Sequence, residues 1–197
     1  MQQFKSKDYV TILLVITNIA VYIFCTIQGN VLYNMGSLSV VDIINRQEYY
    51  RILTSLFLHA NPQHIWGNMI FLAALGDMLE KSIGHGRFFA IYMLAGIGGN
   101  LLSMVHELAT GQFCSTIGAS GAVFGLIGAL LLLICKNNGT YGQISFRRMI
   151  FAIVYLFYSG TQSETTNNMA HLGGFITGFA VMAVFYCITR RRYKRIR

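Results

Sequence analysis

Two polar side chains in otherwise apolar stretches, Ser120 and His171, are of the types needed for nucleophilic catalysis. Ser120 stands in Gly-Ala-Ser-Gly at 118–121, where small neighbours leave its hydroxyl accessible and allow another backbone to approach. A serine becomes a good nucleophile when a base takes its proton, and an imidazole is the usual base. The pair predicts Ser120 as nucleophile and His171 as general base and acid, although glycine-flanked serines are also common in packed membrane helices.

Two further side chains, His64 and Asn68, could support the same chemistry. Both carry N–H groups that can donate to the negative charge that develops on a carbonyl oxygen during acyl transfer. With the backbone N–H of Ser120 they would form an oxyanion hole. The alternative for each of these polar residues is a hydrogen bond to a neighbouring helix, without a catalytic role.

The same residue types give no sign of a metal site. The zinc motif H-E-x-x-H is absent, and His59 and His64 are five residues apart, which does not place both on one helix face. The four cysteines have no C-x-x-C spacing, which argues against zinc and redox sites. We therefore expect no metal and no cofactor, and whether Cys25 and Cys114 pair stays open.

The composition places these residues in a membrane protein. Of 197 residues, 54% are hydrophobic and 11% charged, with a mean hydropathy of +0.52, whereas soluble domains have about a quarter charged. The length fits one domain, 1–197. Six of the 15 Lys and Arg lie in the last eight residues, after an apolar run, which is typical of a membrane-flanking tail and not of nucleic-acid binding.

Apolar stretches of about the length that crosses a bilayer predict an all-α polytopic membrane protein with six transmembrane helices. Four stretches contain no Asp, Glu, Lys or Arg, one carries His64, Asn68 and Asp77, and one is short and follows two arginines. The stretch 28–62 is expected to form a large external loop between helices 1 and 2. The six predicted spans are 9–27, 63–79, 88–105, 115–135, 149–159 and 168–189.

The positive charges predict the orientation of the chain. With six spans and both ends on one side, that side holds thirteen Lys and Arg, and the other side holds only Arg46 and Arg51. Because basic residues accumulate in cytoplasmic loops, both termini are expected in the cytoplasm and the 28–62 loop outside.

In this orientation the polar residues share one depth. The spans 63–79, 115–135 and 168–189 all run from outside to inside, and each carries its polar residues near its outer end. At 1.5 Å per residue, Ser120 is expected about 8 Å below the start of its span and His171 about 5 Å below its own. Ionisable groups are costly in a membrane, so four polar side chains at one depth favour a functional site over separate helix contacts.

Small residues predict how these helices pack. Gly121 and Gly125 form one G-x-x-x-G, and Gly174 and Gly178 form another. Small residues four apart let helix backbones approach closely in lipid. Close packing of the two helices that carry these pairs would bring the serine to the histidine.

The remaining ionisable residues near the spans are interpreted as structural or solvated. Asp77 and Glu80 lie at the inner end of their span, far from the Ser–His pair. His85 and His106 have no partner pattern and are expected in solvent, at loops or helix ends. No carboxylate lies near the outer end of the three helices, so the sequence predicts no third acid beside the pair.

Three motifs in this order resemble those of the rhomboid intramembrane serine proteases, and the likeness covers all six spans. The residues 118–121 resemble the family's nucleophile motif, and Ala-His-Leu-Gly-Gly at 170–174, followed by Gly178, is similar to its catalytic-histidine helix. The segment 59–68 resembles the family's H-x4-H-x3-N segment. Tyr-Arg at 50–51 stands where the family commonly has Trp-Arg, in the first loop.

The resemblance implies roles for particular residues. It implies a Ser–His dyad without a third acid and an oxyanion hole lined by His64 and Asn68. His59 would support the first loop, in which Arg51 also lies. Phe124 stands one helical turn after the serine and would stack on the catalytic histidine; many family members have Tyr there.

The resemblance also implies a function. It implies an intramembrane serine endopeptidase that hydrolyses peptide bonds in or near transmembrane segments of membrane proteins, in contact with membrane lipid and without nucleic acid. The chain resembles the basic six-span bacterial form, which implies the bacterial plasma membrane with an active site open to the external side. Two alternatives stay open: a catalytically inactive rhomboid-like protein that binds membrane clients, and a small transporter or channel.

Overall fold

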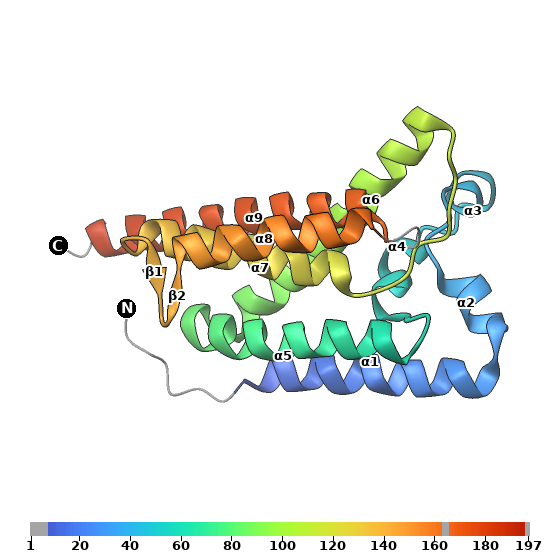
Figure 1. The fold of residues 1–197 in the computed structure, drawn as a ribbon, viewed down its shortest axis with the longest axis horizontal. Coiled ribbons are helices and arrows are strands. Elements are labelled where there is room, and N and C mark those ends of the chain that lie inside the picture. The colour runs from blue at the N-terminus through green and yellow to red at the C-terminus, as the bar shows by residue number, and fades with distance from the viewer. Residues whose placement is uncertain (1–7, 163–165, 196–197) are drawn as a thin grey trace.

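The computed structural model describes residues 8–162 and 166–195, with side chains described up to Thr189, and the chain is mainly helical (Figure 1). Lys5, Lys7 and the side chains from Arg190 onwards, which enter the charge count, lie outside these described residues. The long helices are α1 (Tyr9–Gln28), α5 (Pro62–Ile83), α6 (His85–Thr110), α7 (Ser120–Lys136), α8 (Phe146–Thr161) and α9 (Asn168–Arg195).

Short elements connect the long helices. Between α1 and α5 lie α2 (Asn30–Gly36), α3 (Val40–Arg46), α4 (Arg51–Thr54) and the 3-10 turn η1 (Ser55–Phe57), so the predicted loop is folded into helical turns. An antiparallel hairpin of β1 (Thr140–Tyr141) and β2 (Ile144–Ser145) joins α7 to α8.

The predicted class, an all-α protein with several apolar membrane helices, is confirmed. By length and composition, three helices in the described part of the chain can cross a membrane: α1, α6 and the Asn168–Thr189 part of α9. The helix α7 is a shorter apolar helix of 17 residues. Six spans and an external position for 28–62 stay predictions.

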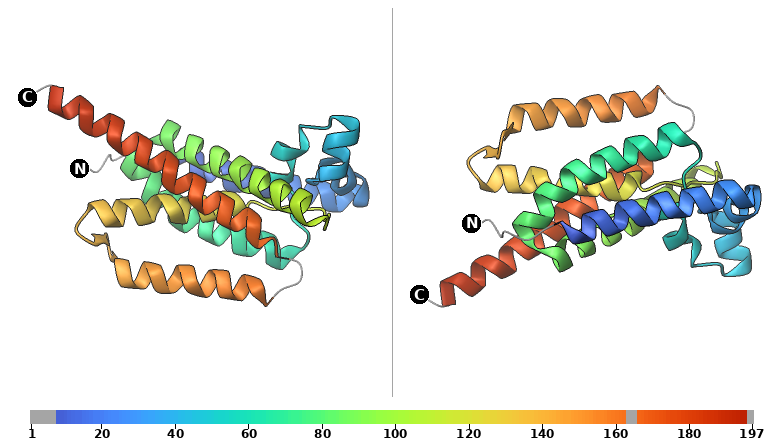
Figure 2. Two further views of the ribbon diagram at one scale, coloured as in Figure 1. Left: turned by 90° about the horizontal axis from the view of Figure 1, so that it is seen from above. Right: turned by 90° about the horizontal axis from the view of Figure 1, so that it is seen from below.

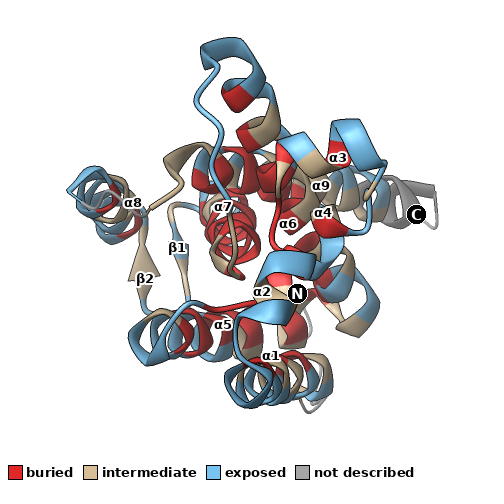
Figure 3. Cartoon of the chain, turned by 90° about the vertical axis from the view of Figure 1, so that its right-hand side faces the viewer, coloured by how far each residue is buried: buried red, intermediate tan, exposed pale blue. Residues whose placement is uncertain are grey.

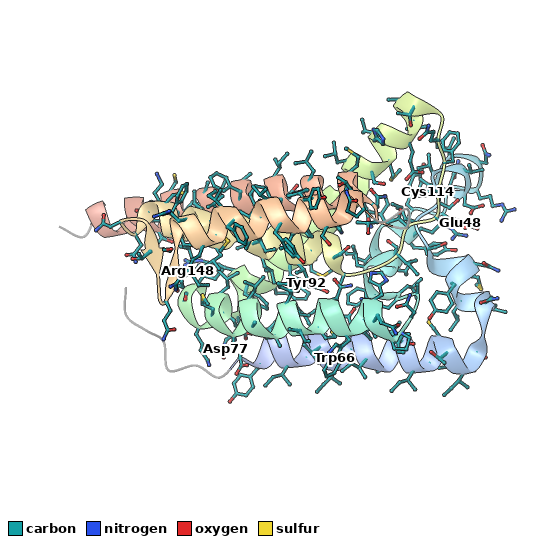
Figure 4. All side chains as sticks on the ribbon, viewed as in Figure 1. Glu48, Trp66, Asp77, Tyr92, Cys114 and Arg148 are labelled. Atoms are coloured by element: carbon teal, nitrogen blue, oxygen red, sulfur yellow. The ribbon has the colours of Figure 1, made fainter. Side chains whose placement is uncertain are left out.

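The helix α7 lies at the centre of the bundle, and its residues from Gly121 to Leu130 are all buried (Figure 3). The helices α6 and α9 pack directly on it, α1 pairs with α5, and α8 stands at the periphery in both views of Figure 2. Asp77 and Arg148 lie at one end of the bundle and Glu48 and Cys114 at the other (Figure 4). The start of α1 and the end of α9 lie towards the first of these ends (Figure 1).

Glycines allow direct backbone contact between α7 and α9. A Cβ added to Gly178 would lie 2.0 Å from the carbonyl oxygen of Gly125, and one added to Gly174 would lie 2.0 Å from that of Gly121. Real Cβ atoms do not approach an oxygen so closely, so only glycine fits at these two positions of α9. The two glycine pairs singled out in the sequence therefore face each other.

The expected start of the fourth helix at Ser115 is wrong. The helix begins at Ser120, because Gly118 has a φ of +126° that ends any helical path and Thr116 pairs with Leu38 in a β-bridge. Composition does not mark the start of this helix, because the residues before Ser120 are uncharged like those of the helix that follows. Ser120 thus stands at the very start of its helix, and the expected depth of about 8 Å within it is wrong as well.

His85 stands at the start of α6 with a partly exposed side chain, as the sequence predicts, but its ring Nδ1 also contacts the carboxylate of the fully buried Glu80, a partner that no sequence pattern indicated. Glu80 accepts hydrogen bonds from the backbone N–H groups of Val10 (2.9 Å) and Thr11 (2.7 Å) and from the Thr11 hydroxyl (2.6 Å). These N–H groups belong to the first turn of α1. The N-cap residue of this helix, Asp8, makes no side-chain hydrogen bond to them. Glu80 therefore has the structural role that the sequence predicts, since it caps α1 from α5. His106 is exposed, as expected.

We expect Gly178→Ala to lower the melting temperature of the detergent-solubilised protein by several degrees or more, because its methyl group would force α9 away from the backbone of α7. Gly86→Ala is the matched control, since an added Cβ there meets nothing within 4 Å and alanine favours the helix. Equal melting temperatures for both variants, measured by thermal unfolding, would show that α7 and α9 are not in backbone contact.

Candidate active site

The structure brings Ser120 and His171 together. Nε2 of His171 lies 2.9 Å from Oγ of Ser120, within hydrogen-bond distance. Ser120 is the first residue of α7 and His171 is the fourth of α9, so the glycine contact between these helices sets the distance. The other ring nitrogen of His171, Nδ1, has no hydrogen-bond partner among the described residues. The arrangement is that of a serine with one adjacent base.

An aromatic ring holds the imidazole from the side. The Phe124 ring stacks on His171 with ring centroids 4.1 Å apart and planes 9° apart. Phe124 also meets Phe157 of α8 edge-on at 5.1 Å. Phe124 follows Ser120 by one helical turn, so the element that carries the hydroxyl also restricts the rotation of the imidazole.

His64 and Asn68 of α5 face the segment that leads into Ser120. A Cβ added to Gly118 would lie 2.7 Å from Nε2 of His64 and 3.9 Å from Nδ2 of Asn68. One N–H of the Asn68 amide donates to the carbonyl oxygen of His64 (3.1 Å), and the amide carries a second N–H. Gly118 donates its own N–H to the carbonyl of Ser55 (2.9 Å), which fixes this turn. Two side-chain donors therefore border the backbone just before Ser120.

His59 is fully buried beside the same turn. Its Nε2 accepts a long hydrogen bond from the backbone N–H of Ala119 (3.5 Å), and its carbonyl accepts one from the hydroxyl of Tyr33 (2.8 Å). Its ring meets that of His64 edge-on at 5.1 Å. Burial, helped by the nearby His64, lowers the pKa of His59 to about 4. His59 is therefore a neutral ring that touches both the first loop and the residue before Ser120.

Arg51 organises the region between α1 and α5. It is 3% exposed, pairs with Glu48 (2.6 Å), and donates to the carbonyls of Asn34 (2.8 Å) and Ser37 (2.9 Å). These carbonyls end α2 and precede α3, so one guanidinium closes the connection between them. Its position agrees with the structural place that the sequence resemblance gives it, and it does not reach the Ser–His pair.

Sequence reasoning missed Asn100, a polar residue inside a predicted span. Its Nδ2 donates to the carbonyl of Ile52 (2.8 Å) and to Oγ of Ser55 (2.9 Å). Since the Ser55 carbonyl in turn accepts from Gly118, Asn100 supports the turn before Ser120 through one intermediate residue. The signal was available, because an amide in a membrane span is costly unless it is hydrogen-bonded.

No group of three or more His, Cys, Asp or Glu in the described part of the chain could hold a metal ion. All four cysteines are free, so the structure leaves Cys25 and Cys114 unpaired. The described side chains of the site supply a hydroxyl, an imidazole and N–H donors.

The fold and the site define a class: a helical membrane protein with a Ser–His pair. Comparison with known proteins gives the family. The rhomboid domain matches residues 46–187. The chain is 36% identical over 156 residues to RHOMBOID-like protein 1 of Arabidopsis thaliana, covering 78% of this chain and 39% of that protein. It is 32% identical over 153 residues to RHOMBOID-like protein 7 of the same plant, covering 77% and 48%.

A bacterial relative is named as a protease. The chain is 33% identical over 142 residues to the rhomboid protease GluP of Bacillus subtilis (strain 168), covering 72% of this chain and 27% of that protein. The chain belongs to the rhomboid family and is an integral membrane protein. It spans less than half the length of these three relatives.

The lowered pKa of His59 predicts a pH-dependent stability. The unfolded chain takes up the proton near its ordinary pKa of 6.5, but the folded chain does so only near 4. The contribution of the neutral His59 ring to the unfolding free energy is therefore complete above pH 6.5 and is lost as the pH falls towards 4. Between pH 7.5 and 5 we expect the wild type to lose about 2 kcal/mol more unfolding free energy than His59→Gln.

Equilibrium unfolding in denaturant, measured at both pH values, tests this difference. His106→Gln is the matched control, because it makes the same change at an exposed residue. Parallel pH dependences for the wild type and His59→Gln would contradict the prediction.

Proposed function

We propose that this chain is an intramembrane serine endopeptidase that hydrolyses peptide bonds in or near transmembrane segments of membrane proteins. The observation that carries the proposal is the 2.9 Å contact between Nε2 of His171 and Oγ of Ser120, in a chain of the rhomboid family. The name of the Bacillus subtilis protease relative supports the same reaction class.

In the proposed acylation step, Oγ of Ser120 attacks the scissile carbonyl carbon while Nε2 of His171 takes the hydroxyl proton. The resulting tetrahedral intermediate collapses, the carbon–nitrogen bond breaks, and His171 returns the proton to the leaving amine. Water then attacks the acyl-enzyme, His171 takes a proton from the water, and Ser120 leaves and recovers its proton from the imidazolium. The products are an amine and a carboxylate fragment.

The negative charge on the carbonyl oxygen needs fixed donors, and we assign this role to His64, Asn68 and the backbone N–H of Ser120. The position of both side chains beside Gly118, two residues before the nucleophile, supports the assignment. Because Ser120 begins α7, its N–H is one of the first four of that helix, which have no partner within the helix. The positive end of the helix dipole favours negative charge at the same place.

The stacked ring of Phe124 is proposed to keep the imidazole turned towards Ser120. Gly118, Gly121, Gly174 and Gly178 are proposed to support the site through the turn before Ser120 and the contact between α7 and α9. His59 and Arg51 are proposed to hold the first loop and the turn, without a part in the reaction.

The proposed location is a bacterial plasma membrane, with both termini in the cytoplasm and the active site open to the external side. The excess of basic residues in the loops on the side of the termini supports this orientation. The start of α1 and the end of α9 lie towards one end of the bundle, which agrees with both termini on one side of the membrane (Figure 1). The proposed partners are transmembrane substrates, whose helix must unwind locally to expose a carbonyl, and membrane lipid.

Ser120→Ala and His171→Ala should each abolish cleavage of a model transmembrane substrate in liposomes and leave the protein folded. A nucleophile and its base act as a unit, so loss of either removes nearly the whole covalent route. Cleavage would be followed by gel electrophoresis and folding by thermal melting. Turnover by Ser120→Ala comparable to the wild type would refute the assignment, and a folded wild type without cleavage would favour a protein that only binds membrane clients.

Asn68→Ala should lower kcat by about 10- to 1000-fold with little change in KM, because an oxyanion donor acts where charge develops in the transition state. The lower end of this range allows for His64 and the Ser120 N–H, which would remain as donors. Measurement of kcat and melting temperature together separates catalysis from packing. An unchanged kcat with a lowered melting temperature would leave Asn68 as a packing residue.

A further inference from the structure

A cluster of buried and half-buried polar residues lies beyond the Ser–His pair, where α6, α9 and the segment before α7 meet. Nδ2 of Asn167 lies 2.6 Å from Oγ of Ser103 and 2.7 Å from Oγ1 of Thr116. Oγ of Ser103 donates to Oε1 of Glu107 (3.0 Å), which is 3% exposed, and the N–H of Cys114 donates to Oε2 (3.3 Å). The cluster is thus one continuous set of hydrogen bonds around a single amide.

The amide of Asn167 caps the helix that carries the histidine. Its Oδ1 accepts from the backbone N–H of Ala170 (3.0 Å), and its backbone carbonyl accepts from the N–H of His171 (3.2 Å). A side-chain acceptor just before a helix fixes the path of the first turn. His171 ends that turn, so Asn167 fixes the position of the backbone that carries the imidazole.

The same amide holds the segment that leads to the serine. Thr116 precedes Ser120 by four residues, and its backbone N–H and carbonyl exchange hydrogen bonds with Leu38 at 3.0 and 2.9 Å. The Asn167 side chain, directly before α9, adds a hydrogen bond of 2.7 Å to Oγ1 of Thr116. One amide therefore connects the segment entering α7 with the first turn of α9.

The hydrogen bonds also fix the orientation of the amide. The N–H of Ala170 can only donate, so the oxygen of the Asn167 amide must face it and the nitrogen must face Ser103 and Thr116. Ser103 uses its proton on Glu107 and is left with lone pairs for Asn167. In a reversed amide, the NH2 group of Asn167 would face the N–H of Ala170, and neither group could accept a hydrogen bond.

We propose that Asn167 is a positioning residue, which ties the Ser120 segment to the His171 turn through Thr116, while Ser103 and Glu107 hold its amide in place. The inference rests on the proposed function. Asn167 does not touch the reacting atoms; together with the glycine contact between α7 and α9, it fixes the distance between the two groups that do. Because a misplacement of about 1 Å can cost about 100-fold in rate, a single lost hydrogen bond here should be visible in kcat.

The test uses three single substitutions and the same transmembrane substrate in liposomes. Thr116→Val removes the hydroxyl that accepts from Asn167 and keeps the shape, and Thr116→Ser keeps the hydroxyl. Asn167→Ser keeps a capping oxygen for α9 but is too short to reach Thr116. We expect Thr116→Val and Asn167→Ser each to lower kcat about 10- to 100-fold with KM within about twofold, and Thr116→Ser to retain most of the wild-type kcat.

The double variant of Thr116→Val and Asn167→Ser tests whether both act through one bond. If they do, the kcat of the double variant should be about that of the less active single variant. If the two substitutions acted independently, their fold-losses in kcat would multiply. Thr11→Val is the control, because it removes a buried hydrogen bond of 2.6 Å to Glu80 near the start of α1 and should lower the melting temperature without changing kcat.

The outcomes separate this inference from the proposed function. An active wild type whose Thr116→Val and Asn167→Ser variants keep its kcat, with melting temperatures lowered as in Thr11→Val, would overturn the positioning role and leave the protease assignment intact. A loss of kcat in Thr116→Ser as large as in Thr116→Val would also overturn it. A folded wild type that cleaves nothing would overturn the proposed function, and the inference with it.

Discussion

The backbone contact between α7 and α9 is the constraint on which the rest of the molecule depends. In lipid, helices gain little from burying apolar surface against each other, so close packing of small residues must supply the attraction. Gly174 and Gly178 bring α9 so near to α7 that an added methyl group would collide with a carbonyl oxygen. The serine and the histidine meet because each stands in the first turn of one of these two helices.

Around this contact, buried and half-buried polar side chains connect segments that have no regular structure in common. A buried amide or carboxylate is costly unless it is hydrogen-bonded, and here each bond also fixes a backbone. Asn100 holds the turn before Ser120 through Ser55, and Asn167 joins the segment before α7 to α9. Far from this site, Glu80 caps α1 from α5 in the same way. These bonds connect the segment before α7 to α6 and α9, and α1 to α5.

The sequence predicts the helices and the candidate pair well, because apolar length and isolated polar residues are local signals. It also predicts the glycine packing and the stack of Phe124 on His171, which the structure contains. It fails where a long-range contact overrides local composition: the bridge from Thr116 to Leu38 and the turn at Gly118 delay α7 to Ser120. The partners of His85 and Asn167 likewise depend on residues that only the fold brings near.

The central claim is that Ser120 is an activated nucleophile, and covalent labelling tests it most directly. The purified protein would be treated in detergent with a fluorophosphonate, which reacts with serines made nucleophilic by an adjacent base, and the modified peptide would be identified by mass spectrometry. The account predicts label on Ser120 in the wild type and its loss when His171 is replaced by alanine. A folded wild-type protein in which Ser120 stays unmodified, or is modified equally without His171, would contradict it.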